Sequence, residues 1–472
     1  MTTLRDRIKR LNLKSLQKKS QEDSDDDEEL AKMDPLERLA RTLELTATVP
    51  KEEDEELSDD DGVYNPFTHP SKVDLQIGPK TVIPSMYKPV QINITPQPVA
   101  LETAAKLRDC LFGNRMWSFS PEWKNDSFQF QAIDSAFPYG LWTTEDGTRN
   151  VIICVQAFIM KNLLFRDEPT KHVMGVKASQ GQPSQADKLK PFEQQRCDAL
   201  IKAISDMLWQ AGEEKRAIVV LMTEHSNFGP SAGFRIDHFV EKLESYEFAD
   251  FQTLLIFIRK HLESFQSTHG VLIFIYSILL SRSAKKLAED LQSERLILPS
   301  DRCSTNMVKL LLTGKATPHL FNGSFEYDDL GNKLLVPEIG LFRRSDVGLL
   351  YLDRRDGRHQ RQPSLEVGTM LKTPKYPVWV TYINGKCGLL FCLKRNLLRE
   401  ARSEHCFDLR YYTGQRSQTE EAKITVDNIS KHGERKKGIY YSKGERLSLL
   451  EECISSRWPE GLIDWHGTLP FI

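Results

Sequence analysis

The stretch "VIICVQAFIMKNLLF", residues 151–165, constrains the fold more than any other part of the chain. Its apolar residues leave no polar face, and a helix that is apolar all round must be buried in a large core. A polar turn containing glycine, "TTEDGTRN" (143–150), leads directly into it. The sequence therefore predicts a buried helix whose first turn is presented at a loop, the layout of a site that carries a reactive group at a helix start.

Charge separates an N-terminal segment from the rest of the chain. Residues 1–62 hold 11 Lys and Arg against 19 Asp and Glu, which leaves 53 against 47 for the remaining residues. Such charge density buries too little apolar surface to offset the entropy of ordering. We predict a largely disordered acidic tail over 1–72, a Pro-rich extended arm over 73–100, and one globular domain over 101–472.

Two serines in the acidic tail stand directly before acidic runs. Ser24 precedes "DDDEE" and Ser58 precedes "DDD", a context that suits acidophilic kinases. A solvated tail explains the same composition without any modification. The solvated tail is the better interpretation of both serines.

Helical patterns come first along the domain and strand patterns later. Apolar spacing and end signals predict helices at 100–113, 191–211, 250–265, 271–280 and 305–312. Strands are predicted at 217–222, 347–352, 376–383 and 387–393. Helices followed by strands favour an α+β fold over a doubly wound sheet.

Location and membrane contact are constrained by apolar runs and cysteines. Near the N-terminus, apolar residues alternate with Arg and Lys instead of forming the apolar core of a secretory signal. The longest apolar run, Val271–Leu280, is too short for a bilayer, which needs about 20 residues. Eight cysteines without dense pairing are typical of free thiols in a reducing compartment. We expect an intracellular protein, cytoplasmic or nuclear, that is not secreted and binds no membrane.

The nearest approach to a metal pattern is the set Cys387, Cys392, His405 and Cys406. The surrounding sequence reads as two strands around a turn, and an offset of five along a strand points Cys387 and Cys392 to opposite faces. Buried cysteines are therefore the better interpretation, and we expect neither a metal nor a cofactor.

Several other polar and aromatic residues allow a functional interpretation, but a structural one suits each better. His225 follows a strand and His319 lies in an apolar block, so a surface position and a packing role are expected. The basic run 354–361, with Arg354, Arg355, Arg358 and Arg361, lacks the interleaved aromatics of a nucleic-acid platform. We expect no nucleic-acid partner. Trp458 and Trp465 are expected to close the core.

A cysteine protease needs a thiolate at a helix N-terminus, a histidine from elsewhere in the fold, and an oxyanion donor shortly before the nucleophile. The loop that begins at Thr143 and leads into the apolar helix has the shape for the first and third of these groups. It carries none of the corresponding side chains.

Blocks between residues 107 and 472 resemble the longer branch of the MINDY deubiquitinases, cysteine peptidases that trim lysine-forty-eight-linked polyubiquitin. The resemblance rests on the order and spacing of "GNRMWSFSPEWKNDSFQF", "VQAFIMKNLLF", "LLLTGKATPHLFNG", "RRSDVGLLYL", "KTPKYPVWV" and "WPEGLIDWHGTLP". It implies a papain-like cysteine-peptidase fold and ubiquitin or polyubiquitin as the partner.

The departures from the family pattern fall where the chemistry should be. Active members read Leu-Val-Gln, two variable residues, then Gly-Gly-Pro-Cys-Gly, where this chain reads "LWTTEDGTRNV". By that register Thr143 replaces the Gln that stabilises the oxyanion, and Arg149 replaces the nucleophilic Cys. Asn150 replaces the Gly that follows the nucleophile. Lys386 falls on the position of the catalytic His. The resemblance therefore implies a site that has lost its nucleophile, its base and its oxyanion donor together.

Arginine has no available lone pair and stays protonated, so Arg149 cannot attack a carbonyl. Cys154 lies more than one helical turn further on and should point into the core. Thr148 with Lys386 would imitate a hydroxyl–lysine pair, the one coherent rescue of activity.

Three functional hypotheses follow. The first is an inactive relative of the MINDY deubiquitinases, like the group of that branch commonly classed as inactive, that can still bind ubiquitin. The second is an active, cysteine-independent deubiquitinase that acts on lysine-forty-eight-linked polyubiquitin and uses Thr148 and Lys386. The third is a scaffold that binds a protein partner through its acidic tail.

Overall fold

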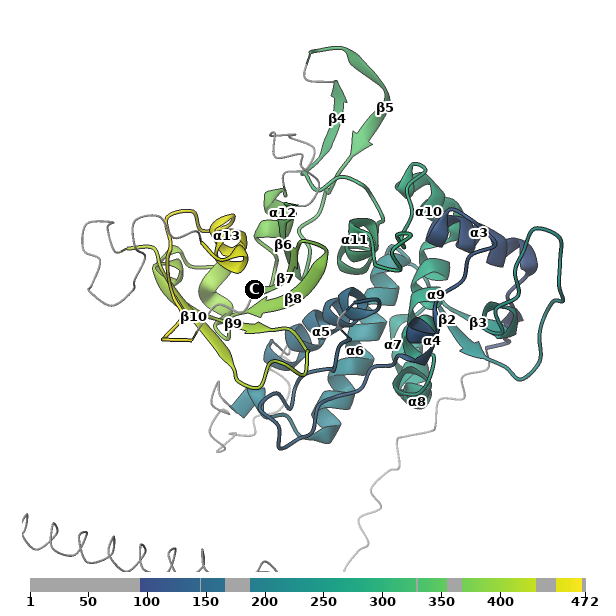
Figure 1. Ribbon diagram of the computed structural model, residues 1–472, viewed down its shortest axis with the longest axis horizontal. Helices are drawn as coiled ribbons and strands as arrows, with labels where there is room; N and C mark the ends of the chain where they lie inside the picture. The colour runs from purple at the N-terminus through teal and green to yellow at the C-terminus, as the bar shows by residue number, and fades with distance from the viewer. Residues whose placement is uncertain are drawn as a thin grey trace, which may run out of the picture. The chain divides into compact units, whose positions relative to one another are not determined.

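Helices fill the first part of the chain and a sheet fills the last, in the order that the sequence predicts (Figure 1). A computed structural model describes residues 94–144, 146–165, 187–327, 330–354, 367–429 and 447–468. All of them belong to the unit Tyr87–Ile472. The acidic segment and most of the Pro-rich segment lie outside the described residues, so their predicted behaviour stays a prediction.

The described helices include long buried ones and short connecting ones. The α-helices are α3 (Leu101–Phe112), α4 (Pro121–Asn125), α5 (Arg149–Leu164), α6 (Glu193–Ala211), α7 (Phe251–Lys260), α8 (Leu262–Gln266), α9 (Gly270–Arg282), α10 (Ala284–Leu291), α11 (Thr305–Thr313), α12 (Thr369–Lys372) and α13 (Leu449–Ser455). Short 3-10 helices are η1 (Asp187–Leu189), η2 (Val240–Lys242), η4 (Arg395–Leu398) and η5 (Ala401–Glu404).

The strands among the described residues form three separate sheets. They are β1 (Gln97–Pro98), β2 (Ala217–Met222), β3 (Leu243–Phe248), β4 (Ser324–Tyr327), β5 (Lys333–Ile339), β6 (Gly348–Leu352), β7 (Val378–Ile383), β8 (Lys386–Phe391), β9 (Cys406–Tyr412), β10 (Ala422–Asp427) and β11 (Leu462–Asp464). The largest sheet has the order β11-β10-β9-β8-β7-β6, and the others are β1-β3-β2 and the hairpin β4-β5. In the largest sheet only β6 and β7 run parallel; its other neighbours are antiparallel.

The large sheet is covered on both faces, which explains its apolar strands. On one face Leu349, Val380 and Leu389 join the main core, and α5 packs on β7 and β8. The opposite face carries residues such as Trp379 and Leu390, and α13 packs on β6 and β7 there (Figure 1). Burial on both faces produces nearly continuous apolar strands instead of alternating ones.

Two helices are buried along their whole length. All 13 residues of α9 are buried, because the helix packs between β2 and α6. In α5, 15 of the 16 residues are buried. The predicted buried helix at 151–165 is confirmed, and it begins two residues earlier, at Arg149.

Some predicted boundaries are accurate and one is wrong. Gly113 ends α3 in the left-handed conformation, with φ at 69°, as predicted. The single helix predicted over 250–265 is instead two helices, α7 and α8, separated at His261. The bend allows Phe265 to be fully buried and its carbonyl to accept a hydrogen bond from the Phe128 N–H. Tertiary packing therefore overrides a continuous helical pattern.

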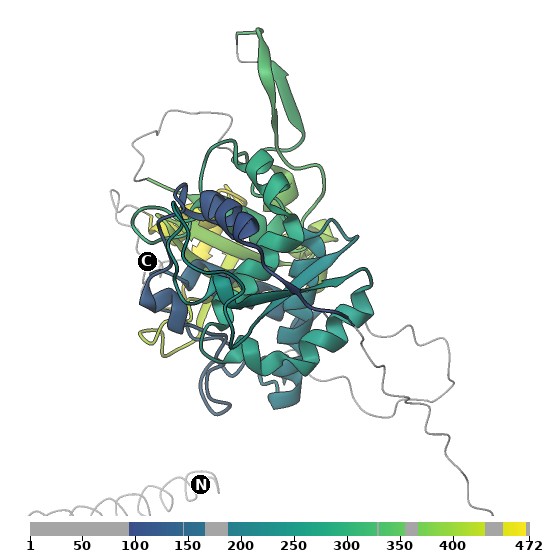
Figure 2. The same cartoon turned by 90° about the vertical axis from the view of Figure 1, so that its right-hand side faces the viewer.

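Several elements were not predicted, among them β3, β9, β10 and the β4–β5 hairpin. The hairpin leaves the rest of the unit as a projecting arm, which is plain in both views (Figures 1 and 2). No helix within the described residues is long and apolar enough to cross a membrane.

Candidate functional site

The N-terminus of α5 is held against the turn that joins β7 to β8. The Asn150 amide donates to the Gly385 carbonyl at 3.0 Å and accepts from the Cys387 N–H at 2.9 Å. The turn itself is Asn384–Gly385, both with positive φ, the geometry that Asn-Gly favours between antiparallel strands. The buried Asn150 amide thus donates one hydrogen bond to the hairpin and accepts one from it. These two bonds fix the start of α5 beside Lys386, the first residue of β8.

A cleft of about 640 Å³ opens at this junction, and Arg149 and Lys386 both line it. The remaining walls come from the end of β7 and its turn, from β9 and the loop after it, and from the starts of β10 and α13 and the C-terminal segment. They are Ile383, Asn384, Tyr411, Thr413, Gln415, Ser417, Gln418, Thr419, Glu420, Glu421, Ala422, Leu449 and Thr468. The family register places Thr143, Arg149 and Lys386 at catalytic positions. The structure brings two of them, Arg149 and Lys386, to one cleft.

Arg149 is a nearly buried cation at the mouth of α5. Its side chain is 5% exposed, and Nε donates to the Cys387 carbonyl at 2.9 Å. Burial raises the pKa of the Tyr411 phenol, and the positive charge of Arg149 acts in the opposite direction. The partial positive charge of the helix N-terminus adds to the guanidinium charge. The arrangement attracts electron-rich groups but has no electron pair to donate.

Thr143 is not among the residues that line the cleft, although it bonds to Thr413, which is. Its N–H donates to the Gly414 carbonyl and its hydroxyl donates to the Thr413 carbonyl, both at 3.0 Å. Because the Thr143 hydroxyl already donates its hydrogen to a backbone carbonyl, it is not directed toward the carbonyl of a substrate in the cleft. Thr143 is therefore placed to hold the β9 end in position, not to stabilise an oxyanion.

Thr148, the proposed rescue nucleophile, is directed toward a different group. Its hydroxyl donates to the Asp126 carboxylate and lies 3.2 Å from the Thr144 hydroxyl. Burial raises the pKa of Asp126, and the hydrogen bond from Thr148 opposes that shift. Thr148 is 2% exposed and is not among the residues that line the cleft with Lys386. The geometry does not support the hydroxyl–lysine pair.

The cysteines near the site are buried. Cys154 is fully buried, as predicted, and burial raises the pKa of its thiol. Cys387 joins the core on the α5 side of the sheet and Cys392 the core on the α13 side, which confirms that the two point to opposite faces. Within the described ranges, no group of three or more His, Cys, Asp or Glu residues is placed to hold a metal ion.

Sequence reasoning missed the wall of the cleft formed by β9 and the loop that follows it. Gln418 orders this loop: its amide donates to the Tyr411 carbonyl at 2.9 Å and accepts from the Thr413 N–H at 2.7 Å. The alternation of apolar residues in "CFDLRYY" and "AKITV" was a usable strand signal. No pattern in the sequence indicates that the Gln418 side chain bonds the backbone of Tyr411 and Thr413.

The other candidates take structural roles. His225 is exposed, and His319 packs on Phe321 with ring centroids 5.2 Å apart. Trp458 and Trp465 are buried as predicted. In the basic run only Arg354 is described, and it pairs with Glu452; the other arginines of that run lie outside the described residues.

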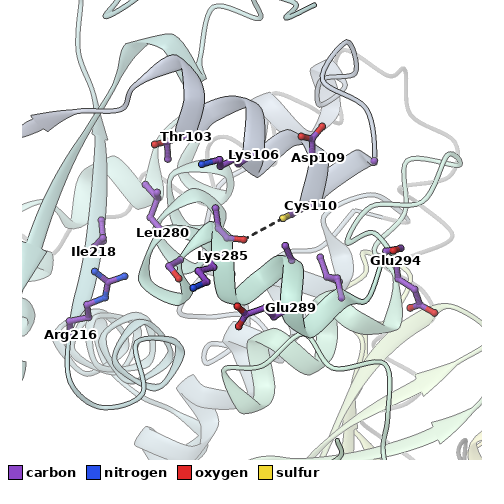
Figure 3. A pocket seen from close by; sticks show the side chains of 16 residues that line it. Thr103, Lys106, Asp109, Cys110, Arg216, Ile218, Leu280, Lys285, Glu289 and Glu294 are labelled. Carbon is purple, nitrogen blue, oxygen red and sulfur yellow. Dashed lines mark hydrogen bonds between the residues drawn. The ribbon is translucent and has the colours of Figure 1, made fainter. Parts of the chain in front are cut away.

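A second cleft, of about 950 Å³, lies between α3 and α10 and contains a cysteine (Figure 3). Burial raises the pKa of Cys110 to about 11, and its sulfur lies 3.9 Å from the Ala284 carbonyl. The lining residues include Lys106, Asp109 and Glu289 but no histidine. A protonated thiol without a base is unsuited to nucleophilic catalysis.

Comparison with known proteins identifies the family of the chain. The conserved domain described as "Deubiquitinating enzyme MINDY-3/4, conserved domain" matches residues 108–467. The chain is 31% identical over 383 residues to "Probable ubiquitin carboxyl-terminal hydrolase MINDY-4" of Xenopus tropicalis, covering 80% of this chain and 48% of that protein. The human protein of that name is 29% identical over 393 residues, 83% of this chain and 48% of the relative.

More distant relatives match a smaller part. Human "Ubiquitin carboxyl-terminal hydrolase MINDY-3" is 27% identical over 255 residues, 50% of this chain and 53% of that protein. The chain spans about half the length of the curated relatives it matches. No solved structure matches it. Because the domain match extends over most of the sequence, the chain belongs to the MINDY-3/4 family of deubiquitinating enzymes.

Proposed function

We propose that this chain is a pseudo-deubiquitinase, which binds ubiquitin or polyubiquitin at the cleft beside α5 without hydrolysing it. The proposal includes a papain-like arrangement of the site, with Arg149 at the position of the nucleophile, Lys386 at that of the base and Thr143 at that of the oxyanion donor. All eight cysteines are free thiols, which supports a place in the cytosol or nucleus.

One observation carries the proposal: the cleft at the start of α5 is lined by a guanidinium and an ammonium group, and by neither a thiol nor an imidazole among its described lining residues. Hydrolysis through a covalent intermediate needs an electron pair on the nucleophile and a base beside it. Neither cation provides one in its protonated form.

The same lining supports binding. Ser417 and Thr419 are exposed, and with Gln415 they offer hydroxyl and amide groups to the backbone of an extended peptide. Glu420 and Glu421 place negative charge at the wall of the cleft. The ubiquitin tail is basic and ends in a carboxylate, so the wall suits its side chains and the two cations suit its terminus.

The two alternatives have less support. Hydrolysis by Thr148 would require its hydroxyl to leave Asp126 and reach Lys386. A scaffold acting through the acidic tail depends on residues outside those that the structure describes.

Calorimetric titration of the full chain with ubiquitin and with lysine-forty-eight-linked tetraubiquitin tests the proposal. Ser417→Trp places a large side chain at the cleft wall, so it should weaken binding by about tenfold or more. Ser231→Trp is the matched control, because Ser231 is also exposed but lies outside the cleft. It should bind as the unmodified chain does.

Two results would contradict the proposal. One is a full chain that binds neither ubiquitin nor the tetramer. The other is equal binding by the unmodified chain and Ser417→Trp, which would move the binding site away from the cleft.

A further inference from the structure

The two cations of the cleft beside α5 reach it from opposite faces of the large sheet. Arg149 belongs to α5, and its Nε binds the carbonyl of Cys387, the residue after Lys386. Lys386 pairs with Ile383, whose side chain belongs to the core on the α13 side. Directly paired residues of an antiparallel ladder share a face, so the Lys386 side chain leaves from the α13 side. Both cations therefore border the cleft at the start of β8.

The start of β8 carries positive charge that the described residues around it do not neutralise. Lys386 is exposed, and within the described part of the chain no carboxylate lies within ion-pair distance of its ammonium group. Arg149 is 5% exposed, and a guanidinium keeps its charge when it is buried. The first turn of α5 contains no acidic residue, so the partial positive charge of the helix N-terminus adds to that of the side chains.

The acidic groups of the cleft stand on a different strand. Glu420 and Glu421 directly precede Ala422, the first residue of β10. Because β9 lies between β8 and β10, two strand spacings, about 10 Å, separate these glutamates from β8. Glu421 also pairs with Arg410, which compensates its charge. The cleft is therefore positive at the start of β8 and negative at the start of β10.

A free C-terminus and an isopeptide bond differ in charge at the group that would meet the two cations. The carboxylate of a free C-terminus is ionised at neutral pH, whereas the amide of an isopeptide bond is neutral. Two nearby cations and a helix N-terminus offset the cost of taking a carboxylate out of water. A neutral amide would cover the same cations without supplying a charge partner, so their lost hydration would not be compensated.

We propose that the cleft selects ubiquitin with a free C-terminal carboxylate over ubiquitin that is joined to a lysine by an isopeptide bond. The inference rests on the proposed function, since it requires the ubiquitin tail to enter this cleft. The carboxylate lies at the start of β8, near Arg149 and Lys386, and a basic side chain of the tail lies near Glu420. The partner is then free ubiquitin or an unanchored chain, whose last subunit keeps its carboxylate.

Calorimetric titration of the full chain with two forms of ubiquitin tests this inference. One form has its natural C-terminal carboxylate. In the other form that carboxylate is converted to a primary amide, which keeps the length and shape of the tail and removes the charge. The carboxylate form should bind about tenfold or more tightly than the amide form. The difference should shrink as the salt concentration rises, because salt screens the exposed charge of Lys386.

Two lysine substitutions locate the preference within the molecule. Lys386→Met removes the ammonium group at an exposed position, so the chain should fold normally and lose most of its preference for the carboxylate form. Lys394→Met is the matched control, because Lys394 is also exposed but does not line the cleft. This variant should keep the full preference.

The outcomes separate this inference from the proposed function. Equal binding of the two ubiquitin forms by the unmodified chain would overturn the inference and leave the proposed function standing. A preference that Lys386→Met and Lys394→Met both keep in full would also overturn it, because the carboxylate would then lie away from the start of β8. Binding of neither form would contradict the proposed function itself, and this inference with it.

Discussion

Replacing Arg108 by methionine is expected to lower the free energy of unfolding by about 3–5 kcal/mol. Arg108 is fully buried on α3, and its guanidinium lies 2.8 Å from the Asp237 carboxylate, which is 3% exposed. It also donates to the carbonyls of Arg115 and Arg235. Without the guanidinium, the buried carboxylate still accepts hydrogen bonds from the N–H groups of Phe239 and Val240.

Chemical denaturation of the full chain measures this effect. Arg115→Met is the matched control, because the Arg115–Asp109 pair has the same 2.8 Å separation but exposed side chains, and should cost under about 1 kcal/mol. Adding Asp237→Asn to Arg108→Met should recover part of the stability, because the uncompensated charge is removed. Equal costs for the two arginines would show that the buried pair is not a structural anchor.

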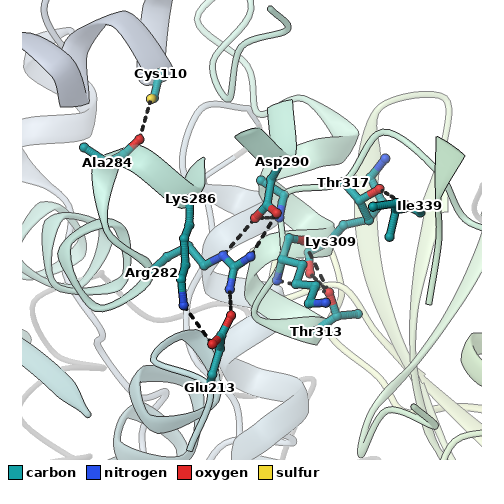
Figure 4. Close-up of polar contacts among 12 residues, drawn as sticks. Cys110, Glu213, Arg282, Ala284, Lys286, Asp290, Lys309, Thr313, Thr317 and Ile339 are labelled. Carbon is teal, nitrogen blue, oxygen red and sulfur yellow. Dashed lines mark hydrogen bonds and ion pairs between the residues drawn. The ribbon is translucent and has the colours of Figure 1, made fainter. Parts of the chain in front are cut away.

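The second large effect has the opposite sign: Lys309→Met should raise the stability of the protein near neutral pH. Lys309 is 2% exposed on α11, and burial lowers its pKa from 10.5 to about 7, although Glu294 opposes the shift. The Thr313 hydroxyl, one turn further along α11, donates to the Lys309 carbonyl at 2.7 Å (Figure 4). His319 also interacts electrostatically with this lysine.

The direction of the pH dependence follows from proton uptake. Between about pH 7 and 10.5 the unfolded chain carries a proton on Lys309 that the folded chain has lost, so stability rises with pH across this window. Below pH 7 the folded chain carries the buried charge at full cost. A shift of this size corresponds to roughly 4–5 kcal/mol as an upper limit.

The stability difference between Lys309→Met and the unmodified chain should therefore be largest at pH 6–7 and shrink toward zero near pH 10.5. Urea denaturation at several pH values measures it. Lys285→Met, at an exposed lysine of α10, should show no such trend. A constant difference across the same pH range would mean that Lys309 keeps its proton in both states.

The elements that the sequence predicted are those whose burial is visible in local composition. The runs that became α5 and α9 lack a polar face because they are covered on all sides. The division of the helix at His261 had no local signal, because it depends on Phe265 reaching the core near Phe128. A sequence pattern predicts an element correctly when the composition of that segment decides how it is buried. It fails when contacts with a segment far away in the chain decide the structure.

The same limit applies to the candidate site. The family register selected Arg149 and Lys386, and the structure places both on one cleft; that they replace a nucleophile and a base stays a prediction. The positions of Thr143 and Gln418 depend on hydrogen bonds across the chain, to Thr413 and its neighbours. No spacing rule in a single sequence reports such contacts.

The most direct test of the central claim uses ubiquitin with an electrophile at its C-terminus together with lysine-forty-eight-linked tetraubiquitin. We expect the full chain to form no covalent adduct and to release no shorter ubiquitin chains. Cleavage of the tetramer, or an adduct on a residue of the cleft that disappears when that residue is replaced, would contradict it.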